Sequence, residues 1–212
     1  MALQEDEIVD QNDGNDSLVI STMRRRHLRS VLRIEEQTSS TPWSLGLFLS
    51  EARRPERVYL VAKKGKEIVG FAGMLFALNE GHITTIAVDP AYQGARIGTR
   101  LMLVLMRRAI AHGSDCVTLE VRASNTSAKR MYARFGFMPA GTRTAYYKDP
   151  VEDAMVYWAY DVDSENYQER LVEIERSLNE PFIYEHSEWD TDTDDQLDEV
   201  DGEPNETKNG YL

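Results

Sequence analysis

The spacing of apolar residues changes at Pro90, and this change constrains the fold more than any other feature of the chain. Residues 57–89 contain three runs of apolar and β-branched residues, which the turn-forming segments "KKGKE" and "NEGH" separate. We expect these runs to form three neighbouring antiparallel strands. After Pro90 the apolar residues recur at helical spacing: Leu101, Val104, Leu105 and Ala109. A group of strands that leads into a helix is typical of an α/β domain.

The remaining segments extend this pattern in both directions. "LVISTM", "CVTLEVRA", "MPAGTRTAYY" and "DAMVYWAYDV" are typical of strands. "RRRHLRSVLRIEEQ" predicts a helix with its arginines mostly outward, and a short second helix is expected to start at Thr41-Pro42. "NTSAKRMYARFGF" predicts a helix that ends at Gly136, and the helix after Pro90 ends at Gly113. The order β-α-α-β-β-β-α-β-α-β-β predicts a mixed sheet with helices on both faces.

Charge is distributed unevenly along the chain. The net charge is −12, but residues 1–17 carry six acidic residues and no basic one, and residues 161–212 carry 18 acidic and three basic residues. Residues 18–160 hold the remaining 12 acidic and 21 basic residues. This basic part suits an anionic ligand such as a phosphorylated cofactor, although a surface of solvated arginines also explains the charge.

The same segments give the expected domain boundaries. We expect an acidic disordered tail at 1–17, a folded domain at 18–160, an amphipathic helix at 161–180 and an acidic disordered tail at 181–212. The helix is indicated by four apolar residues at helical spacing: Tyr167, Leu171, Ile174 and Leu178. We expect it to pack on its own domain, with the docking of a partner as the alternative.

Composition disfavours several kinds of site. The single cysteine, Cys116, excludes an internal disulfide and lies in a strand-like segment where a small buried residue is expected. Four scattered histidines lack metal-ligand spacing, so we expect no metal site. No apolar run is long enough to cross a membrane, and the acidic N-terminus does not resemble a signal peptide. We therefore expect a cytoplasmic protein without membrane or nucleic-acid partners, of open oligomeric state.

The segment "DPAYQGARIGTRLM" places a glycine-containing loop between a predicted strand and a predicted helix. Backbone N–H groups at such a helix N-terminus point outward, and the helix dipole adds partial positive charge, so the position suits a phosphate group. Residues 94–98 match neither the dinucleotide-binding nor the Walker pattern. On its own the loop is also consistent with a plain turn.

Longer motifs add a family resemblance. "ITTIAVDPAYQGARIGTRLM" and "LEVRASNTSAKRMYARFGF" resemble the two core motifs of the Gcn5-related N-acetyltransferase (GNAT) superfamily, and the second is similar to that of the bacterial ribosomal-protein alanine N-acetyltransferases (RimI type). "RIEEQTSSTPWS" and "YYKDPVEDAMV" are similar to that subfamily's flanking segments. The resemblance implies a GNAT fold: a mixed, mostly antiparallel sheet with a splay between the fourth and fifth strands, where acetyl-CoA binds. It also implies direct transfer of the acetyl group to an amine, without an acyl-enzyme.

The resemblance assigns roles to individual residues. It implies that Glu120 is the general base and Tyr132 the general acid. The residues implied to bind the cofactor come from the fourth strand, the loop with the start of the next helix, and the end of the fifth strand: Ile86, Ala87, Val88, Gln93, Gly94, Ala95, Arg96, Ile97, Gly98, Thr99 and Asn125. Trp43, Tyr146 and Tyr147 are implied to line a peptide entrance, although packing explains Trp43 nearly as well.

The chemistry of amine acetylation agrees with the two catalytic roles. A protonated α-amine must lose a proton before it attacks a carbonyl, and a carboxylate such as Glu120 accepts that proton directly or through one water. The departing CoA thiolate needs a proton, which a phenol such as Tyr132 supplies. The alternatives are that Glu120 forms a structural ion pair with Arg122 or another arginine, and that Tyr132 only packs.

Arg96 departs from the family's Q-x-x-G-x-G pattern, since it occupies the position of the first glycine while Gln93 and Gly98 are in place. An arginine resists the positive φ that glycine allows. We expect Arg96 to have a nearly helical φ, because Gly94 and Ala95 precede it and the helix starts within a few residues. Its guanidinium is expected either to lie in solvent or to bind CoA phosphates.

These observations predict an enzyme that acetylates the N-terminal alanine of a small-subunit ribosomal protein. A second hypothesis keeps the chemistry and changes the acceptor to other protein N-termini, a lysine or a small amine. A third is a non-catalytic module that binds CoA or RNA, which the presence of both Glu120 and Tyr132 disfavours.

Overall fold

The computed structural model of the protein describes residues 17–185. Residues 1–16 and 186–212, which make up most of the two predicted tails, lie outside the described residues. The strands of the described part are β1 (Leu18–Thr22), β2 (Arg57–Lys64), β3 (Glu67–Ala77), β4 (Glu80–Val88), β5 (Cys116–Arg122), β6 (Met138–Lys148), β7 (Val151–Tyr160) and β8 (Phe182–Glu185). Its helices are α1 (Leu28–Thr38), α2 (Leu45–Ala52), α3 (Ile97–His112), α4 (Thr126–Arg134) and α5 (Glu165–Arg176), with short 3-10 helices η1 (Arg25–His27) and η2 (Pro90–Tyr92).

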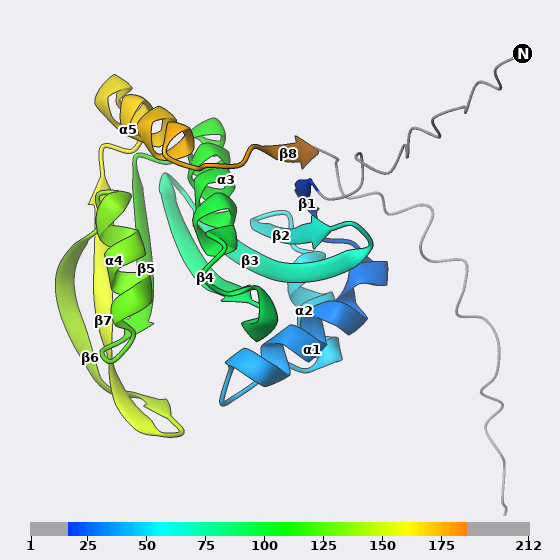
Figure 1. Ribbon diagram of the computed structural model, residues 1–212. Helices are drawn as coiled ribbons and strands as arrows, with labels where there is room; N and C mark the ends of the chain where they lie inside the picture. Colours follow the sequence, from blue (N-terminus) through cyan, green and yellow to red (C-terminus); the bar gives the residue numbers. More distant parts are fainter. Residues whose placement is uncertain (1–16, 186–212) are drawn as a thin grey trace, which may run out of the picture.

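The strands form one sheet in the order β6-β7-β5-β4-β3-β2-β1-β8 (Figure 1). Neighbouring strands are antiparallel, except that β4 with β5 and β1 with β8 are parallel. The element order predicted for residues 18–160 and the mixed, mostly antiparallel sheet are confirmed.

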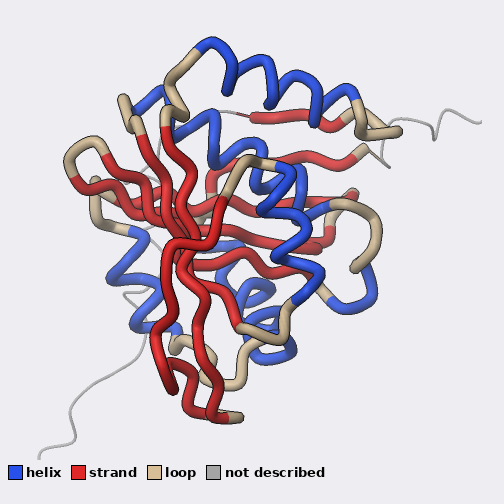
Figure 2. The backbone as a smooth tube through the Cα atoms, turned by 90° about the vertical axis from the view of Figure 1, so that its left-hand side faces the viewer, coloured by secondary structure: helices blue, strands red, loops and turns tan. Residues whose placement is uncertain are grey.

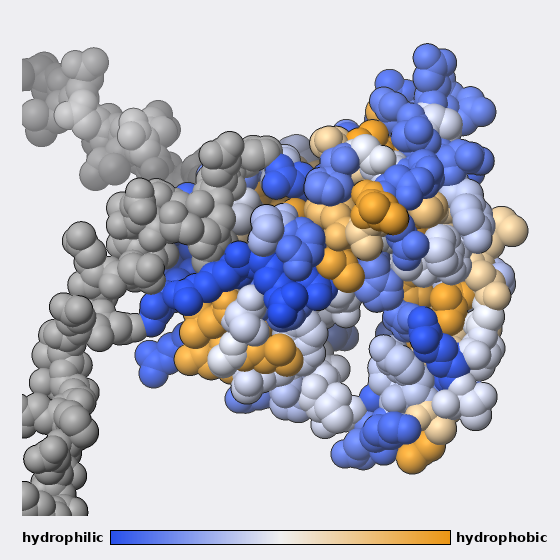
Figure 3. Space-filling model, turned by 180° about the vertical axis from the view of Figure 1, so that it is seen from behind, coloured by the Kyte–Doolittle hydropathy of each residue, from blue (hydrophilic) through white to orange (hydrophobic). Residues whose placement is uncertain are grey.

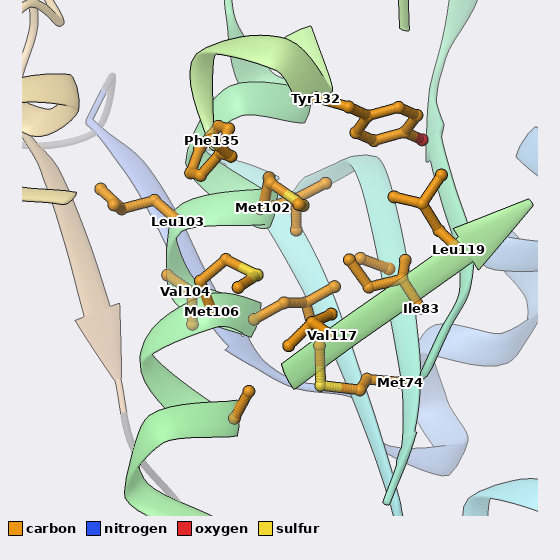
Figure 4. Close-up of a cluster of buried hydrophobic side chains, with 14 of the residues drawn as sticks. Met74, Ile83, Met102, Leu103, Val104, Met106, Val117, Leu119, Tyr132 and Phe135 are labelled. Atoms are coloured by element: carbon orange, nitrogen blue, oxygen red, sulfur yellow. The ribbon is translucent and has the colours of Figure 1, made fainter. Parts of the chain in front are cut away.

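Helices cover both faces of the sheet, as predicted (Figure 2). Successive side chains of a strand point to opposite faces, so each central strand contributes to two cores. Leu60 and Ala62 of β2 pack in the core that α3 and α4 cover, whereas Tyr59 and Val61 pack beneath α1 and α2. In the first of these cores, side chains of α3 and α4 meet those of β5 (Figure 4).

Helix boundaries follow local signals. Gly113 after α3 and Gly136 after α4 have left-handed φ values of +89° and +81°, in keeping with the predicted helix ends. α2 begins at Leu45, later than predicted, because the Ser44 side chain accepts the N–H of Leu47 and caps the helix there. Within residues 17–185, none of the helices combines the length and the apolar character that crossing a membrane requires.

α5 lies within the segment that was expected to be an amphipathic helix, and it packs on its own domain. Its buried residues are Tyr167, Leu171 and Ile174, which belong to the core beneath α3. The Tyr167 hydroxyl donates to the carbonyl oxygen of Phe135 (2.5 Å), so α5 is also bound to the end of α4.

β8 corrects the expectation that the chain is disordered from residue 181 onward. It pairs in parallel with β1, with Leu18 opposite Phe182 and Ser21 opposite Glu185. Phe182 and Tyr184 alternate along the strand and pack against the core, which an acidic composition alone does not reveal.

β4 and β5 separate before either strand ends. Their parallel pairing covers only residues 80–83 of β4 and 116–119 of β5. β5 stays paired with β7 as far as Arg122, and β4 stays paired with β3 as far as Val88. Thr84 is an extra residue in the β4 register against β3, at the point where the separation begins. The predicted splay between the fourth and fifth strands is therefore confirmed.

Candidate active site

A cavity of about 550 Å³ occupies the opening between β4 and β5. Figure 3 shows the hollow from behind, between the half of the molecule that carries α1 and α2 and the half that carries β6 and β7. Eight of the predicted site residues line it: Trp43, Ile86, Ala87, Glu120, Asn125, Tyr132, Tyr146 and Tyr147. Val88 and the loop residues 93–99 are not part of it.

The predicted phosphate-binding loop lies between the end of β4 and α3. Gly94 has a φ of +85° and no atom beyond its chain neighbours within 4 Å of the place a Cβ would take, so glycine satisfies a backbone requirement there rather than a packing one. Gln93 Nε2 donates to the Val88 carbonyl oxygen (3.2 Å) and so closes the loop onto β4. The side chains of Ile97 and Thr99 are buried, so the first turn of α3 has its backbone N–H groups to offer, the arrangement that suits a phosphate.

Arg96 differs from what we expected. Its φ is +57° and its ψ +22°, so the prediction of a nearly helical φ is wrong. The residue is the N-cap of α3 in a left-handed conformation, which glycine adopts without strain and arginine does not. Its Nη1 donates to the carbonyl oxygen of Ser177 at the C-cap of α5 (2.7 Å), and this contact offsets part of the strain. A contact with CoA phosphates stays a prediction.

Glu120 lies on β5 immediately after the last residue that pairs with β4. Its side chain is 10 % exposed, with Oε1 3.0 Å from Arg143 Nη2 and Oε2 3.2 Å from His82 Nε2. An ion pair with an arginine is thus present, but not with Arg122, which pairs with Glu152 instead (3.2 Å). Glu120 also lines the cavity, so the carboxylate is fixed by two neighbours and still faces the space where an acceptor would lie.

Tyr132 lies on α4 and is buried, with 8 % of its surface exposed. Burial, with a smaller effect from Tyr147, raises the pKa of its phenol above the ordinary value. Figure 4 shows the ring beside Leu119, with its hydroxyl directed away from α4. The phenol therefore stays protonated at neutral pH, as a proton donor must.

Aromatic residues from the α1–α2 connection and from β6 line the cavity. The rings of Trp43 and Phe48 are 5.1 Å apart, so Trp43 packs in the core beneath α1 and α2 and lines the cavity at once. The rings of Tyr146 and Tyr147 on β6 meet edge to face at 5.2 Å. Burial raises the pKa of the Tyr147 phenol.

Arg122 connects several elements around the cavity. Its guanidinium lies 4.1 Å from the centre of the Tyr147 ring and donates to Ser40 Oγ in the α1–α2 connection (2.8 Å). It also binds Glu152 on β7 (3.2 Å), whose Oε1 accepts the N–H of Ser124 (2.6 Å). Arg122 thus joins three segments that are distant in sequence.

Sequence reasoning did not identify His82, Arg122 or Arg143 as parts of the site. Arg122 follows Glu120 by two residues on one strand face, so strand periodicity contains a signal for it. The positions of His82 and Arg143 depend on strand pairing: His82 lies opposite Thr118 because β4 and β5 are parallel neighbours. No local pattern in the sequence contains that pairing.

Within the described residues, neither a metal site nor a thiolate nucleophile is indicated. Within residues 17–185, no three His, Cys, Asp or Glu side chains gather where they would hold a metal ion. Burial, together with Asp115 and Glu80, raises the pKa of Cys116 to about 11, so its thiol is protonated at neutral pH.

Comparison with known proteins agrees with this geometry. A sequence model of the acetyltransferase (GNAT) family matches residues 24–137. The chain is 34 % identical over 143 residues to the N-alpha-acetyltransferase RimI of Mycobacterium tuberculosis, covering 65 % of this chain and 89 % of that protein. It is 33 % identical over 139 residues to the ribosomal protein bS18-alanine N-acetyltransferase of Escherichia coli, covering 65 % of this chain and 93 % of that protein.

Solved structures give the same result. The crystal structure of the Escherichia coli enzyme superposes with a TM-score of 0.63 at 30 % identity, over 68 % of this chain and 94 % of that chain. The structure of Ard1 from Thermoplasma volcanium has the same TM-score of 0.63 at 24 % identity, over 68 % of this chain and 97 % of that chain, which is a likeness of fold.

Proposed function

Since the chain belongs to the acetyltransferase (GNAT) family and is an N-acetyltransferase that uses acetyl-CoA, we propose that its acceptor is the N-terminal α-amine of a ribosomal protein, with alanine as the first residue. The observation that carries the proposal is that one cavity is lined by a held carboxylate, Glu120, a protonated phenol, Tyr132, and an aromatic entrance. The Escherichia coli relative, a ribosomal protein bS18-alanine N-acetyltransferase, supports the ribosomal acceptor.

The residues present fit the donor. Beyond residue 83, β4 has β3 on one edge and the cavity on the other, so the backbone of Ile86 and Ala87 is available to a ligand that extends along the strand. The loop at 93–99 offers backbone N–H groups at the positive end of the α3 dipole to the pyrophosphate. Asn125, whose side chain caps α4 by accepting the N–H of Ala128 (3.0 Å), lines the same cavity. Bound acetyl-CoA supplies an acetyl group activated as a thioester.

Two side chains move protons in the proposed reaction. Glu120 accepts a proton from the α-ammonium group of the acceptor, directly or through one water, so that the free amine attacks the thioester carbonyl. His82 and Arg143 hold this carboxylate in place on β5. As the C–S bond breaks, Tyr132 donates its phenolic proton to the departing sulfur, and the second proton that the amine nitrogen loses restores the phenol. The acetyl group passes directly to the amine, and no residue of the chain is acylated.

The entrance supports a peptide as the acceptor. Tyr146 and Tyr147 on one side and Trp43 on the other present flat apolar walls, which suit an extended chain. Arg122 fixes both sides relative to each other through Ser40 and Tyr147.

The test measures CoA release from acetyl-CoA with a panel of peptides. Peptides that copy alanine-starting N-termini of small-subunit ribosomal proteins are compared with versions that start with serine or methionine, and with N-terminally blocked peptides that contain lysine. The proposal predicts the largest kcat/KM for the alanine peptides, with mass spectrometry placing the acetyl group on the α-amine. Acetylation of lysine or of a small amine alone would contradict the proposed acceptor while leaving the family assignment intact.

A further inference from the structure

The loop proposed to bind the cofactor is joined to the C-terminal part of the fold by two arginines. Arg96, the N-cap of α3, donates from Nη1 to the Ser177 carbonyl oxygen (2.7 Å). Arg100, one turn later, donates from Nη1 to the Ala95 carbonyl oxygen of the loop (2.8 Å) and from Nη2 to the Glu180 carbonyl oxygen (2.9 Å). Ser177 and Glu180 lie between α5 and β8, which crosses past α3 in Figure 1.

These contacts are well defined on both sides. Arg100 is 4 % exposed, so each of its two carbonyl partners replaces water that the guanidinium has lost. Ser177 is held in turn, because its Oγ donates to Ile174 and accepts from Arg134 Nη2 of α4 (2.8 Å). The Ser177 carbonyl that accepts from Arg96 thus belongs to a fixed support rather than to a free chain end.

The charges explain why α5 is needed there. A helix N-terminus carries partial positive charge, so two arginines in and next to the first turn of α3 are unfavourable by themselves. The C-terminus of α5 presents carbonyl oxygens with partial negative charge, which favour cations. Contact with the C-terminus of α5 therefore offsets the unfavourable charge of two arginines beside the N-terminus of α3. The same contact holds Arg96 in its left-handed conformation.

We propose that α5 and the segment up to β8 serve as a support for the cofactor loop, in which Arg96 and Arg100 are positioning residues that set the affinity for acetyl-CoA. The inference rests on the proposed cofactor site at residues 93–99. The match to the sequence model of the family ends at residue 137, so α5 and the segment up to β8 lie outside the matched residues. Neither arginine takes part in proton transfer, and their loss is expected to change binding of the donor rather than the chemical step.

The first test uses Arg96, whose side chain is exposed, so its variants are expected to fold. Arg96→Ala keeps the strained position and loses the contact, and it is expected to raise the KM for acetyl-CoA about tenfold, with kcat within about twofold, as is usual for coupling between sites. Arg96→Lys keeps a cation that reaches the single Ser177 carbonyl, so it is expected to restore most of the affinity. Calorimetry with acetyl-CoA gives the same order of affinities without turnover.

The second test separates positioning from general packing. Arg100 donates from two nitrogens to two carbonyl oxygens, and a lysine has a single side-chain nitrogen. Arg100→Lys is therefore expected to raise the KM for acetyl-CoA, whereas Arg96→Lys is expected to restore most of the affinity. The matched control is Arg107→Ala, which removes an ion pair between the same helices, α3 and α5, at Glu175 (2.6 Å) but has no contact to the loop. It is expected to leave the KM unchanged.

The outcomes are distinct. Wild-type affinity in Arg96→Ala, or an equal rise in KM for Arg107→Ala, would overturn the support while leaving the proposed function standing. Failure of the wild-type protein to bind acetyl-CoA in the calorimeter would overturn both. A fall in kcat at unchanged KM in the Arg96 variants would also contradict a positioning role.

Discussion

The Glu120 carboxylate is held in place, since His82 of the neighbouring strand β4 and Arg143 of β6, two strands away, approach its two oxygens. Such a group keeps its orientation toward the cavity while the acceptor enters. A catalytic role and an ion pair, which the sequence presents as alternatives for Glu120, are therefore compatible. In the proposed mechanism Arg143 sets the orientation of the Glu120 carboxylate, which still faces the cavity and can accept a proton from an acceptor there.

Glu120→Gln tests the base directly. The amide occupies the same space and accepts no proton, so kcat is expected to fall about 10²–10⁴-fold, the usual size of an acid–base contribution. The KM for acetyl-CoA should remain close to that of the wild type. Steady-state CoA release at neutral pH measures both values, and near-full turnover would rule out Glu120 as the base.

Tyr132→Phe tests the acid. Loss of the phenolic hydroxyl is expected to lower kcat about 10²-fold, because the departing sulfur then lacks its proton donor. Tyr132 is buried, so the thermal unfolding midpoint is measured alongside. Unchanged kcat with a lowered midpoint would show that the side chain only packs in the core.

At the scale of elements, the sequence predicted most of the fold because its signals are local. Apolar spacing indicated the three strands before Pro90 and the helix after it, and Gly113 and Gly136 marked the ends of two helices. β8 was missed because its stability comes from pairing with β1, more than 150 residues away in sequence, rather than from its own composition. The φ of Arg96 was missed for a related reason: the Ser177 contact that offsets part of its strain is distant in sequence.

The site was predicted less completely than the fold. Its proposed residues follow from motif positions, and eight of them line one cavity, but the contacts that hold them depend on strand register. The Thr84 bulge and the end of the β4–β5 pairing decide where the opening begins, and neither leaves a pattern in the sequence. Arg143 contacts Glu120 across two strand pairings, β5 with β7 and β7 with β6.

The α1–α2 connection gives a pH-dependent prediction. Glu35 is buried at the end of α1 and accepts the N–H of Trp43 (3.4 Å), and burial raises the pKa of its carboxyl. The folded protein therefore binds this proton more tightly than the unfolded chain does, so stability falls as pH rises from the ordinary glutamate pKa through the raised one. Glu35→Gln is expected to remove this loss.

Thermal unfolding from about pH 4 to pH 7 measures the effect, since glutamate titrates in this range. The midpoint of Glu35→Gln relative to the wild type should rise with pH, whereas that of Glu36→Gln, at an exposed neighbouring residue, should not. Parallel curves for the wild type and Glu35→Gln would contradict the prediction.

At the scale of the whole molecule, charge is separated between the described and the remaining parts of the chain. Residues 17–185 carry 20 acidic and 23 basic residues, a net charge of +3, against −12 for the full chain. The acidic segments 1–16 and 186–212 therefore reverse the sign of the net charge. An excess of negative charge in these segments discourages non-specific association with polyanions. Added salt screens this repulsion and so shortens its range.

Deletion of residues 1–16 and 186–212 tests this effect. The shortened chain keeps every helix and strand of the described part, so it should retain acetyltransferase activity. Its affinity for RNA at low salt is expected to rise about tenfold and to approach that of the full chain at high salt. Equal RNA binding by the two chains would remove the electrostatic role, and lost activity would assign the deleted segments a part in the reaction.

We propose that acetyl-CoA binds where β4 and β5 separate, along β4 and against the N-terminus of α3. Hydrogen exchange of the wild-type protein with and without acetyl-CoA tests it most directly. Acetyl-CoA bound there is expected to slow the exchange of the backbone amides at residues 86–88 and 94–99. Unchanged exchange in both segments, with protection appearing elsewhere in the chain, would contradict it.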